Sequence, residues 1–395
     1  MTDRSGSTGP APSPLDGVRV LDLSQVVSGP ICGRLLADLG AVVTKVEPPE
    51  GDIIRNLQPR VGDEPVSVYF TWANAGKESI VVDLRSPAGA DLVQRLAMAS
   101  DVVLENFRPG VLEKFGLDAD TLIARHPRLV YCSISGWGLA NSWSQRRAYA
   151  AMVQAEVGRV ELDARLRNAA PEQSPHVDGD ITPGLLAVSA VVAALFQRER
   201  TGRGQHLDVS MAEALVYTDE WTSTELAGYD GDRIPDTWNY PVFTLADGTA
   251  AAFMGDPHRR LPEIAAALTD APIDYTTSRA EALRILGDLV SKVADFPTLE
   301  ARLEIFGFLV AEVRTVSQLA DTPWAHERGV FTEVEPGARV ARAPFRSDES
   351  SIGVRGPAPR LGEHTRAVLS ERLGLGEDAL DALEADAVIG TKRHV

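Results

Sequence analysis

Residues 176–184, HVDGDITPG, set two carboxylates, Asp178 and Asp180, immediately before a long apolar run. Residues 183–200 are apolar on nearly all sides, which predicts a buried helix with Thr182 as its N-cap and a proline at its first position. The partial positive charge and free N–H groups of such a helix end favour an ionised carboxylate, which can act as a nucleophile. Acidic residues also cap helices at this position, so position alone leaves both roles open.

The elements that must position these carboxylates follow an alternating pattern. In about the first 140 residues, β-like runs alternate with segments that carry apolar residues at three- and four-residue spacing. The expected strands are residues 18–24, 41–47, 79–84, 102–106 and 129–135, and residues 205–211 are expected to return as a further strand. This pattern predicts an α/β fold with a Rossmann-like, doubly wound large domain. The first β-to-α turn lacks Gly-x-Gly-x-x-Gly spacing, so we expect no nicotinamide or flavin cofactor.

Composition divides the chain further. Residues 1–13 are rich in Ser, Gly and Pro, which predicts a disordered tail that is neither a signal peptide nor an anchor. We expect the large domain over residues 14–215 and a smaller α+β domain over residues 216–334. Residues 335–395 are expected to form a C-terminal segment that returns to the large domain.

Charge and cysteine content exclude several classes of function. The 395 residues are 44% hydrophobic, enough for a sizeable core, and carry a formal net charge of −17. This acidic balance argues against a nucleic-acid or membrane partner, and no apolar run approaches the roughly 20 residues needed to cross a bilayer. The two cysteines, Cys32 and Cys132, have no ligand spacing. We therefore expect a cytoplasmic protein with neither a disulfide framework nor a metal site.

Motifs along the whole chain resemble those of CoA-transferase family III, the CaiB/BaiF type. This family includes formyl-CoA transferase, carnitine CoA-transferase and the related alpha-methylacyl-CoA racemases. The matching segments are LDGVRVLDLSQVVSGP, LGAVVTKVEPPEGD, YFTWANAGKESIVVDL, DVVLENFRPGVLEKFGLD, GDITPG, ERTGRGQHLDVSM and RLGEHTRAVL. ENFRPG and TGRGQ, at their proper separation, are the most specific of these. The resemblance implies a homodimer whose two chains interlock.

The resemblance also implies a reaction. Asp180, rather than Asp178, would attack an acyl-CoA thioester to form a mixed anhydride. The released CoA thiolate would attack the aspartyl carbonyl, and the resulting enzyme thioester would pass CoA to an acceptor acid. The partners would be an acyl-CoA donor and a free carboxylic acid. Coenzyme A would take part as a substrate thioester, with no permanently bound cofactor.

Contacts to CoA are carried over from the same resemblance. The expected contact residues are Val26, Val27, Ser28, Lys77, Asn106, Phe107, Arg108, Arg147 and Tyr149. Lys77 and Arg147 would meet the phosphates, although solvated surface cations would look the same in sequence. Asn106 and Phe107 lie at the end of a predicted strand, where open α/β sheets bind ligands. His364, in GEHT, is expected to be structural, and the nearness of His176 to Asp180 along the chain is weak support for a general base.

Two alternatives remain open from the sequence. A racemase needs two acid/base groups on opposite faces of the carbon next to the thioester. Tyr149 stands where the racemases carry a histidine, and a phenol with a reference pKa near 10 is a poor base at neutral pH, so transfer is favoured. Asp256 falls near an acidic position of the racemases. The other alternative is a CoA-ester-binding protein without turnover, against which Asp180 argues. Residues 228–238 hold only two glycines where formyl-CoA transferase has a run of glycines over its active site.

Overall fold

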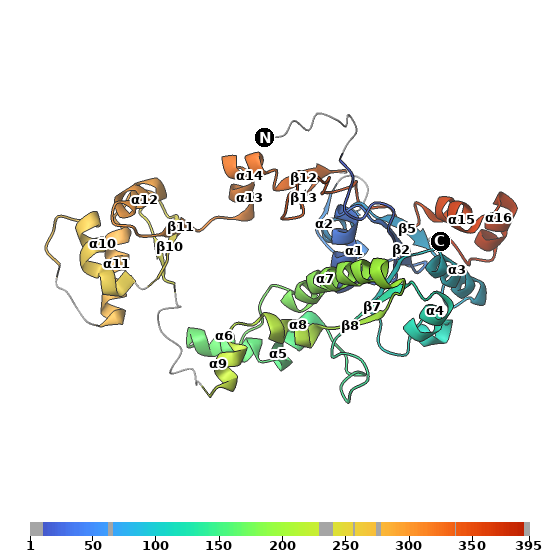
Figure 1. The fold of residues 1–395 in the computed structure, drawn as a ribbon. Coiled ribbons are helices and arrows are strands. Elements are labelled where there is room, and N and C mark those ends of the chain that lie inside the picture. Colours follow the sequence, from blue (N-terminus) through green and yellow to red (C-terminus); the bar gives the residue numbers. More distant parts are fainter. Residues whose placement is uncertain are drawn as a thin grey trace. The chain divides into compact units, whose positions relative to one another are not determined.

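The computed structural model of the protein describes residues 11–61, 66–228, 240–255, 257–273, 278–335 and 337–390. These residues form two compact units (Figure 1). The larger unit holds the described residues up to Leu226 and from Gly329 onward, and the smaller unit is Ala227–Arg328. The expected boundary at residue 216 falls inside α8 (Met211–Thr218), a helix that packs into the core of the larger unit through Leu215, and the smaller unit begins at Ala227.

A six-stranded sheet forms the centre of the larger unit. Its strands are all parallel and lie in the order β5-β2-β1-β6-β7-β8. They are β1 (Arg19–Asp22), β2 (Val42–Glu47), β5 (Glu78–Val81), β6 (Val102–Glu105), β7 (Val130–Ser135) and β8 (His206–Ser210). Each strand overlaps a run expected to be a strand, and the expected α/β fold with a parallel sheet is confirmed. The order changes direction between β1 and β6, where such sheets leave a crevice for ligands at the carboxyl ends of the strands.

Helices cover both faces of this sheet (Figure 1). One face packs on α3 (Pro87–Met98), α4 (Ala119–Arg125), α15 (Thr365–Leu373) and α16 (Glu377–Ala385). The other packs on α1 (Ser28–Asp38), α5 (Ala150–Glu156), α7 (Asp178–Thr201) and α8. Neighbouring residues of β1 show why two cores form, because Val20 faces one set of helices and Leu21 the other. This alternation is the period of two that a strand imposes on its side chains.

Shorter elements complete the larger unit. They are η1 (Ile53–Asn56), β3 (Arg60–Val61), β4 (Val66–Ser67), α2 (Val68–Asn74), η2 (Leu112–Phe115), α6 (Arg159–Arg167), α9 (Thr222–Leu226), β12 (Phe331–Val334) and β13 (Ala338–Ala341). Strands β3 and β4 form one antiparallel pair, and β12 and β13 form another. Helix α2 follows the first of these pairs and brings an aromatic run to the carboxyl side of the sheet.

The smaller unit has its own core around an antiparallel sheet of order β11-β10-β9. Its elements are β9 (Val242–Thr244), β10 (Ala250–Phe253), η5 (Pro257–Arg260), α10 (Leu261–Leu268), α11 (Arg279–Val290), α12 (Phe296–Glu304), β11 (Val310–Glu312), α13 (Val316–Ala320) and α14 (Pro323–Arg328). Phe253, Ile264 and Leu286 are buried at its centre. This separate core explains why the unit is compact on its own.

The C-terminal segment borders the outermost strand, β5. The backbone N–H of His364 donates to the carbonyl oxygen of Ser79 at 2.9 Å, and the Ser79 N–H donates to His364 Nδ1 at 3.2 Å. Farther along, the N–H of Asp83 donates to the carbonyl oxygen of Val388 at 2.9 Å. The structural role expected for His364 is therefore confirmed.

Helix α7 corrects one expectation about membranes. Its length and composition alone would allow it to cross a bilayer, a test that core helices of soluble proteins also pass. The helix itself was expected over residues 183–200, but its polar first residues, from Asp178, were not counted as part of it. Ala187, Val191 and Ala194 pack it into the core instead.

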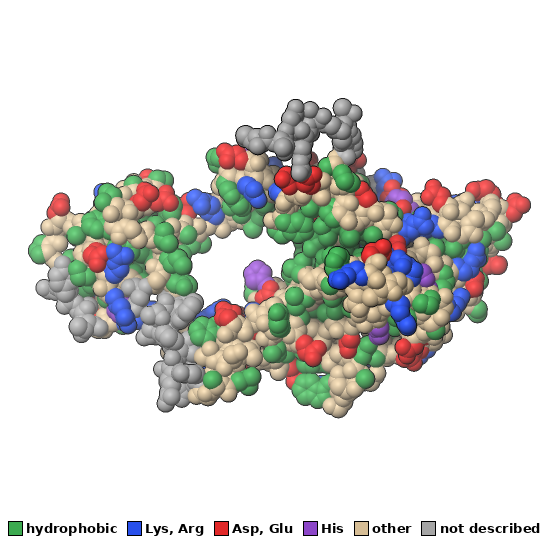
Figure 2. Space-filling view, viewed as in Figure 1, with side chains coloured by type: hydrophobic (Ala, Val, Ile, Leu, Met, Phe, Trp, Pro, Cys, Tyr) green, Lys and Arg blue, Asp and Glu red, His purple; other side chains and the backbone are tan. Residues whose placement is uncertain are grey.

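On the face of the molecule drawn in Figure 2, acidic and basic side chains are interspersed.

Candidate active site

Helix α7 begins at Asp178, five residues before the expected first position at Pro183, and Pro183 lies inside it. The early start is possible because other groups take the first N–H groups. The N–H of Gly179 donates to Oε1 of Gln154 on α5 at 3.2 Å, and that of Asp180 donates to the Val177 carbonyl oxygen at 2.9 Å. The N-cap residue is Val177, whose side chain makes no capping hydrogen bond, and Thr182, expected as the N-cap, lies within the helix. Asp180 is thus the third residue of the helix.

Two glycines let this helix end approach its neighbours closely. A Cβ on Gly179 would lie 2.8 Å from the Cα of Ala150, at the start of α5. A Cβ on Gly184 would lie 2.5 Å from the carbonyl oxygen of Ser28, at the start of α1. Side chains at either position would push the helices apart. The glycines of GDITPG therefore fix Asp180 between the first turns of α1 and α5.

Asp180 lines a pocket of about 250 Å³ at the carboxyl side of the sheet. Most of the expected contact residues line the same pocket. They are Val26, Val27 and Ser28 before and at the start of α1, Asn106, Phe107 and Arg108 after β6, and Tyr149 before α5. Lys77 and Arg147 are not among the lining residues. The structure thus gathers segments that are widely separated in sequence around one carboxylate.

The electrostatics of Asp180 differ from the expectation based on the helix end. The side chain is half-buried, and this burial raises the pKa of Asp180 from its ordinary value of 3.8 to about 6. Burial therefore outweighs the favourable helix N-terminus. At neutral pH the carboxylate is still mostly ionised. A carboxylate of higher basicity that remains ionised is suited to nucleophilic attack.

An apolar cluster beside the pocket explains this burial. Val27, Ile31 and Phe70 form its buried part, and Val26, Tyr69, Trp72 and Ile181 pack against them. The rings of Tyr69 and Trp72 lie 5.3 Å apart, and burial together with the Asp180 charge raises the pKa of Tyr69. The sequence reasoning missed Tyr69 and Trp72, although both lie in the matching segment YFTWANAGK.

Asn106 holds the first turn of the fold rather than presenting a free amide. Its Oδ1 accepts from the N–H of Gln25 at 2.8 Å, and its Nδ2 donates to the carbonyl oxygen of Gln25 at 2.8 Å and to Ser28 Oγ at 3.2 Å. These bonds use both ends of the carboxamide. Asn106 therefore joins the carboxyl ends of β1 and β6, and Gln25 itself lines the pocket. The sequence reasoning did not single out Gln25.

Lys77 is a correction to the expected phosphate contacts. Its side chain is fully buried, and Nζ donates to Asp22 Oδ2 at 2.8 Å, to the Pro30 carbonyl oxygen at 2.9 Å and to Asn74 Oδ1 at 2.9 Å. These acceptors satisfy all of the ammonium hydrogens. Burial lowers the pKa of Lys77 to about 8, while the Asp22 carboxylate opposes that change. Lys77 is part of the internal support of the sheet.

The arginines before Tyr149 are also placed differently than expected. Arg147 is exposed and lies outside the pocket lining, whereas its neighbour Arg146 is part of the lining. The Arg146 guanidinium carbon lies 4.2 Å from the ring centroid of Trp143, and the side chain forms an ion pair with Glu156. Adjacent arginines cannot be told apart by sequence pattern, because which of them faces the pocket depends on the loop conformation.

The remaining candidates lie elsewhere or outside the description. His176 is exposed and is not part of the pocket lining. Cys32 and Cys132 are buried and unpaired. Asp256 and residues 229–238 of the segment expected to cover the site lie outside the described residues.

Comparisons with known proteins point to one family. Residues 15–365 match the model of CoA-transferase family III. The chain is 34% identical to a succinyl-CoA:mesaconate CoA-transferase of Haloarcula hispanica, an alignment that covers 92% of this chain and 97% of the relative. It is 32% identical to a succinate–glutarate CoA-transferase of Agrobacterium fabrum over 91% of this chain and 95% of the relative.

A solved structure extends this similarity to the fold. A CaiB/BaiF family protein from Brucella suis is similar with a TM-score of 0.80 and 31% identity, over 91% of this chain and 100% of that one. Four of the seven sequence motifs that suggested the family supply residues to the Asp180 pocket: LDGVRVLDLSQVVSGP, DVVLENFRPGVLEKFGLD, GDITPG and ERTGRGQHLDVSM. From matches that span nearly the whole length, it follows that this chain belongs to CoA-transferase family III.

Proposed function

We propose that this CoA-transferase moves CoA from an acyl-CoA thioester to a free carboxylic acid through a thioester on Asp180. The observation that supports this most is the placement of Asp180, a half-buried carboxylate in a pocket to which four of the family motifs supply residues. Its pKa of about 6 leaves it ionised at neutral pH while raising its basicity above that of a solvated aspartate. A nucleophile with these properties is what the first step requires.

The proposed reaction exchanges carboxylates and thiolates at acyl carbons. An Asp180 carboxylate oxygen attacks the thioester carbonyl carbon, the C–S bond breaks, and CoA leaves as a thiolate. The thiolate then attacks the Asp180 side-chain carbonyl carbon and releases the donor acid as a carboxylate. The acceptor carboxylate repeats both steps in reverse on the enzyme thioester. Asp180 ends as a free carboxylate, and no net proton is taken up.

For the substrates, we propose succinyl-CoA as donor and a small dicarboxylic acid as acceptor. The two relatives described above are named for succinyl-CoA or succinate and for mesaconate or glutarate. Arg108 lines the Asp180 pocket, is exposed, and has no ion-pair partner among the described residues. A guanidinium in this place is suited to bind a second carboxylate or a phosphate of CoA.

Racemisation is not favoured by any observation of the pocket. Among the described residues, no histidine lines the pocket with Asp180. Tyr149 lines it, but a single phenol beside a single carboxylate does not supply the two ordinary bases that proton exchange needs. The pocket around an ionised carboxylate also supports turnover over simple binding of a CoA ester.

Trapping of the enzyme thioester tests the proposal directly. The protein is incubated with succinyl-CoA, treated with hydroxylamine or borohydride, and digested for peptide mass analysis. The expected product is a hydroxamate or an alcohol on Asp180, absent from Asp180→Ala. Asp178→Ala is the matched control, because Asp178 lies in the same helical turn and outside the pocket lining. Label on Asp178, or solvent exchange of an alpha-proton of a 2-methylacyl-CoA without any label, would overturn the assignment.

We also propose that the protein is a homodimer. In the single chain, α7 exposes Leu185, Val192 and Phe196, of which Phe196 is 67% exposed. Their spacing of seven and four residues places them on one face of the helix. A second copy of the chain would bury this apolar stripe. Sedimentation should give a dimer at micromolar concentration, and Phe196→Asp should weaken it relative to Gln197→Asp, an exposed position about 100° around the same helix from Phe196. A wild-type monomer would overturn the proposal.

A further inference from the structure

The turn between β1 and α1 contains an unfavourable backbone conformation. Val26 has a φ of 67°, in the left-handed region. A β-branched side chain is especially ill-suited to this region, and such residues persist only where neighbouring groups hold them. Val26 and both of its sequence neighbours line the Asp180 pocket. The conformation therefore lies at the site of the proposed chemistry.

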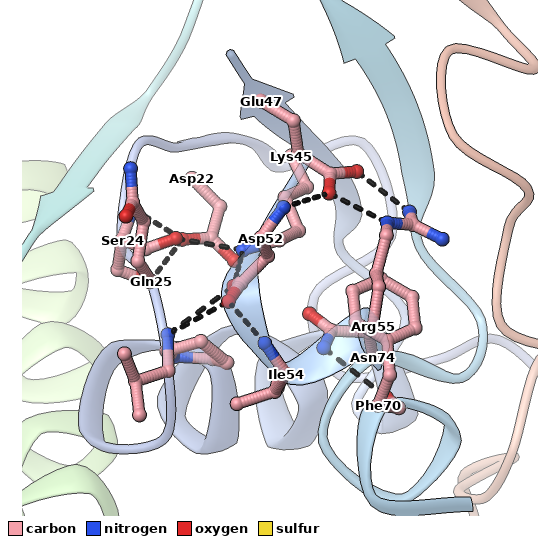
Figure 3. A network of polar contacts seen from close by, with 12 residues as sticks. Asp22, Ser24, Gln25, Lys45, Glu47, Asp52, Ile54, Arg55, Phe70 and Asn74 are labelled. Atoms are coloured by element: carbon pink, nitrogen blue, oxygen red, sulfur yellow. Dashed lines mark hydrogen bonds and ion pairs between the residues drawn. The ribbon is translucent and has the colours of Figure 1, made fainter. Parts of the chain in front are cut away.

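Asp52 holds Val26 in this conformation. The backbone nitrogen of Val26 lies 3.2 Å from Oδ2 and 3.3 Å from Oδ1 of Asp52, and its N–H donates to this carboxylate. The Asp52 side chain is fully buried, accepts from the N–H of Ile54 at 3.2 Å, and lies 2.9 Å from Nζ of Lys45 (Figure 3). This carboxylate is thus fixed from two sides and can itself fix the turn.

The rest of the turn is held in the same way. Lys45 Nζ donates to the carbonyl oxygen of Ser24 at 2.7 Å, and the Ser24 N–H donates to Asp22 Oδ1 at 3.0 Å (Figure 3). Asn106 binds both backbone groups of Gln25. Both backbone polar groups of Ser24 and of Gln25, together with the Val26 N–H, therefore bond to the network within the fold rather than to groups of the pocket.

The start of α1 remains available on the pocket side. We find no acceptor among the described residues for the N–H groups of Val27 and Ser28, which precede the first intrahelical bond. N–H groups at a helix start carry partial positive charge. Each step proposed for Asp180 passes negative charge through a tetrahedral oxyanion, and oriented N–H groups stabilise such charge.

We propose that Asp52 is a positioning residue for CoA transfer. Its carboxylate binds the Val26 N–H and so maintains the left-handed conformation that presents the start of α1 to Asp180. The inference rests on the proposed transfer at Asp180. Loss of the Asp52 acceptor should slow the formation of the enzyme thioester more than it weakens CoA binding, because Asp52 is buried beneath the turn and does not line the pocket.

The test compares two variants with the same net charge. Lys45→Met is combined with Asp52→Asn or with Asp52→Leu, so that no buried charge is left unpaired. Asn and Leu have the same branched shape, but only Asn carries an acceptor for the Val26 N–H. We expect single-turnover thioester formation at least about tenfold slower with Leu than with Asn. CoA dissociation constants should differ less than about threefold.

A glycine at position 26 supplies the decisive comparison. Glycine adopts the left-handed region without penalty, so in a Val26→Gly background the difference between Asn and Leu should fall below about threefold. Ala387→Gly, which also replaces a residue of positive φ (54°), should leave the difference unchanged. Equal rates in the Val26 background, or a difference that persists in Val26→Gly, would overturn the proposal. So would a Leu variant that unfolds in both backgrounds, because Asp52 would then serve folding alone. A wild-type protein that never forms the thioester would instead refute the proposed function.

Discussion

Replacement of Asp180 by asparagine should make the protein inactive and more stable at neutral pH. The folded state raises the pKa of Asp180 from 3.8 to about 6, so at pH 7 the half-buried anion destabilises the fold by at most about 3 kcal/mol. Asparagine has no charge to desolvate. Because a half-buried amide without partners also has a desolvation cost, we expect a gain of about 1–3 kcal/mol in the free energy of unfolding.

The pH dependence gives this prediction its sign. An acid whose folded pKa exceeds its unfolded pKa binds protons more tightly in the folded state, so stability falls as pH rises between the two values. The free energy of unfolding of the wild type should therefore fall by at most about 3 kcal/mol as the pH rises from about 4 to about 6. Asp180→Asn lacks the titrating group, so its advantage should be present at pH 7.5 and nearly absent at pH 4. In the wild type, transfer activity should fall about tenfold for each pH unit below 6, as the nucleophile becomes protonated.

Urea unfolding of both proteins at pH 4 and pH 7.5, together with transfer assays, measures these effects. Asp178→Asn is the matched control, since it removes a carboxylate from the same helical turn outside the pocket lining. That variant should retain transfer and lose about 0.3–1 kcal/mol through the helix end. The reasoning is refuted if Asp180→Asn is less stable than the wild type at pH 7.5, or if its advantage is the same at both pH values.

Other changes test the support of the site. Lys77→Met leaves its buried carboxylate partner unpaired, so we expect a loss of about 3–5 kcal/mol in urea unfolding and unchanged CoA affinity of the folded protein; an affinity loss without a stability loss would restore Lys77 to the CoA site. Gly184→Ala adds a methyl group 2.5 Å from a backbone oxygen of α1, so it should lower the free energy of unfolding by about 1–3 kcal/mol and slow transfer. Gly376→Ala is the control, because a methyl group added there meets nothing within 4 Å. Arg108→Ala should raise the calorimetric Kd for succinyl-CoA about tenfold. Arg147→Ala should raise this Kd less, because Arg147 does not line the pocket. Equal increases in Kd for the two variants would contradict the assignment of Arg108 as the substrate-binding arginine.

The sheet could be predicted from sequence because its signal is local. Runs such as residues 18–24 and 129–135 are short, apolar and bounded by turn residues, which is sufficient to identify buried strands. The start of α7 could not be predicted in this way, since it depends on the amide of Gln154, which comes from another helix. The identity of Asp180 as the central carboxylate rested on the family motif, because helix-end physics alone treats Asp178 and Asp180 alike.

Side-chain roles were predictable only where no distant partner decides them. Lys77 in NAGK has the residue type of a phosphate ligand, but Asp22 and the backbone of Pro30 bind its ammonium group inside the fold. Asn106 was correctly placed beside the pocket, yet its carboxamide binds the backbone of Gln25. In both cases the partner lies tens of residues away, and no spacing rule connects the two.

The contacts between the C-terminal segment and β5 have a consequence for aggregation. An uncovered edge strand offers a row of free N–H and C=O groups to strands of other molecules. Here His364 and Val388 occupy such groups at Ser79 and Asp83, on the outer side of β5. Truncation before His364 would expose that edge while leaving the Asp180 pocket lining intact in sequence. Because such a truncation also removes the α15 and α16 side chains that pack on the sheet, loss of soluble protein would reflect intermolecular strand pairing together with a reduced core.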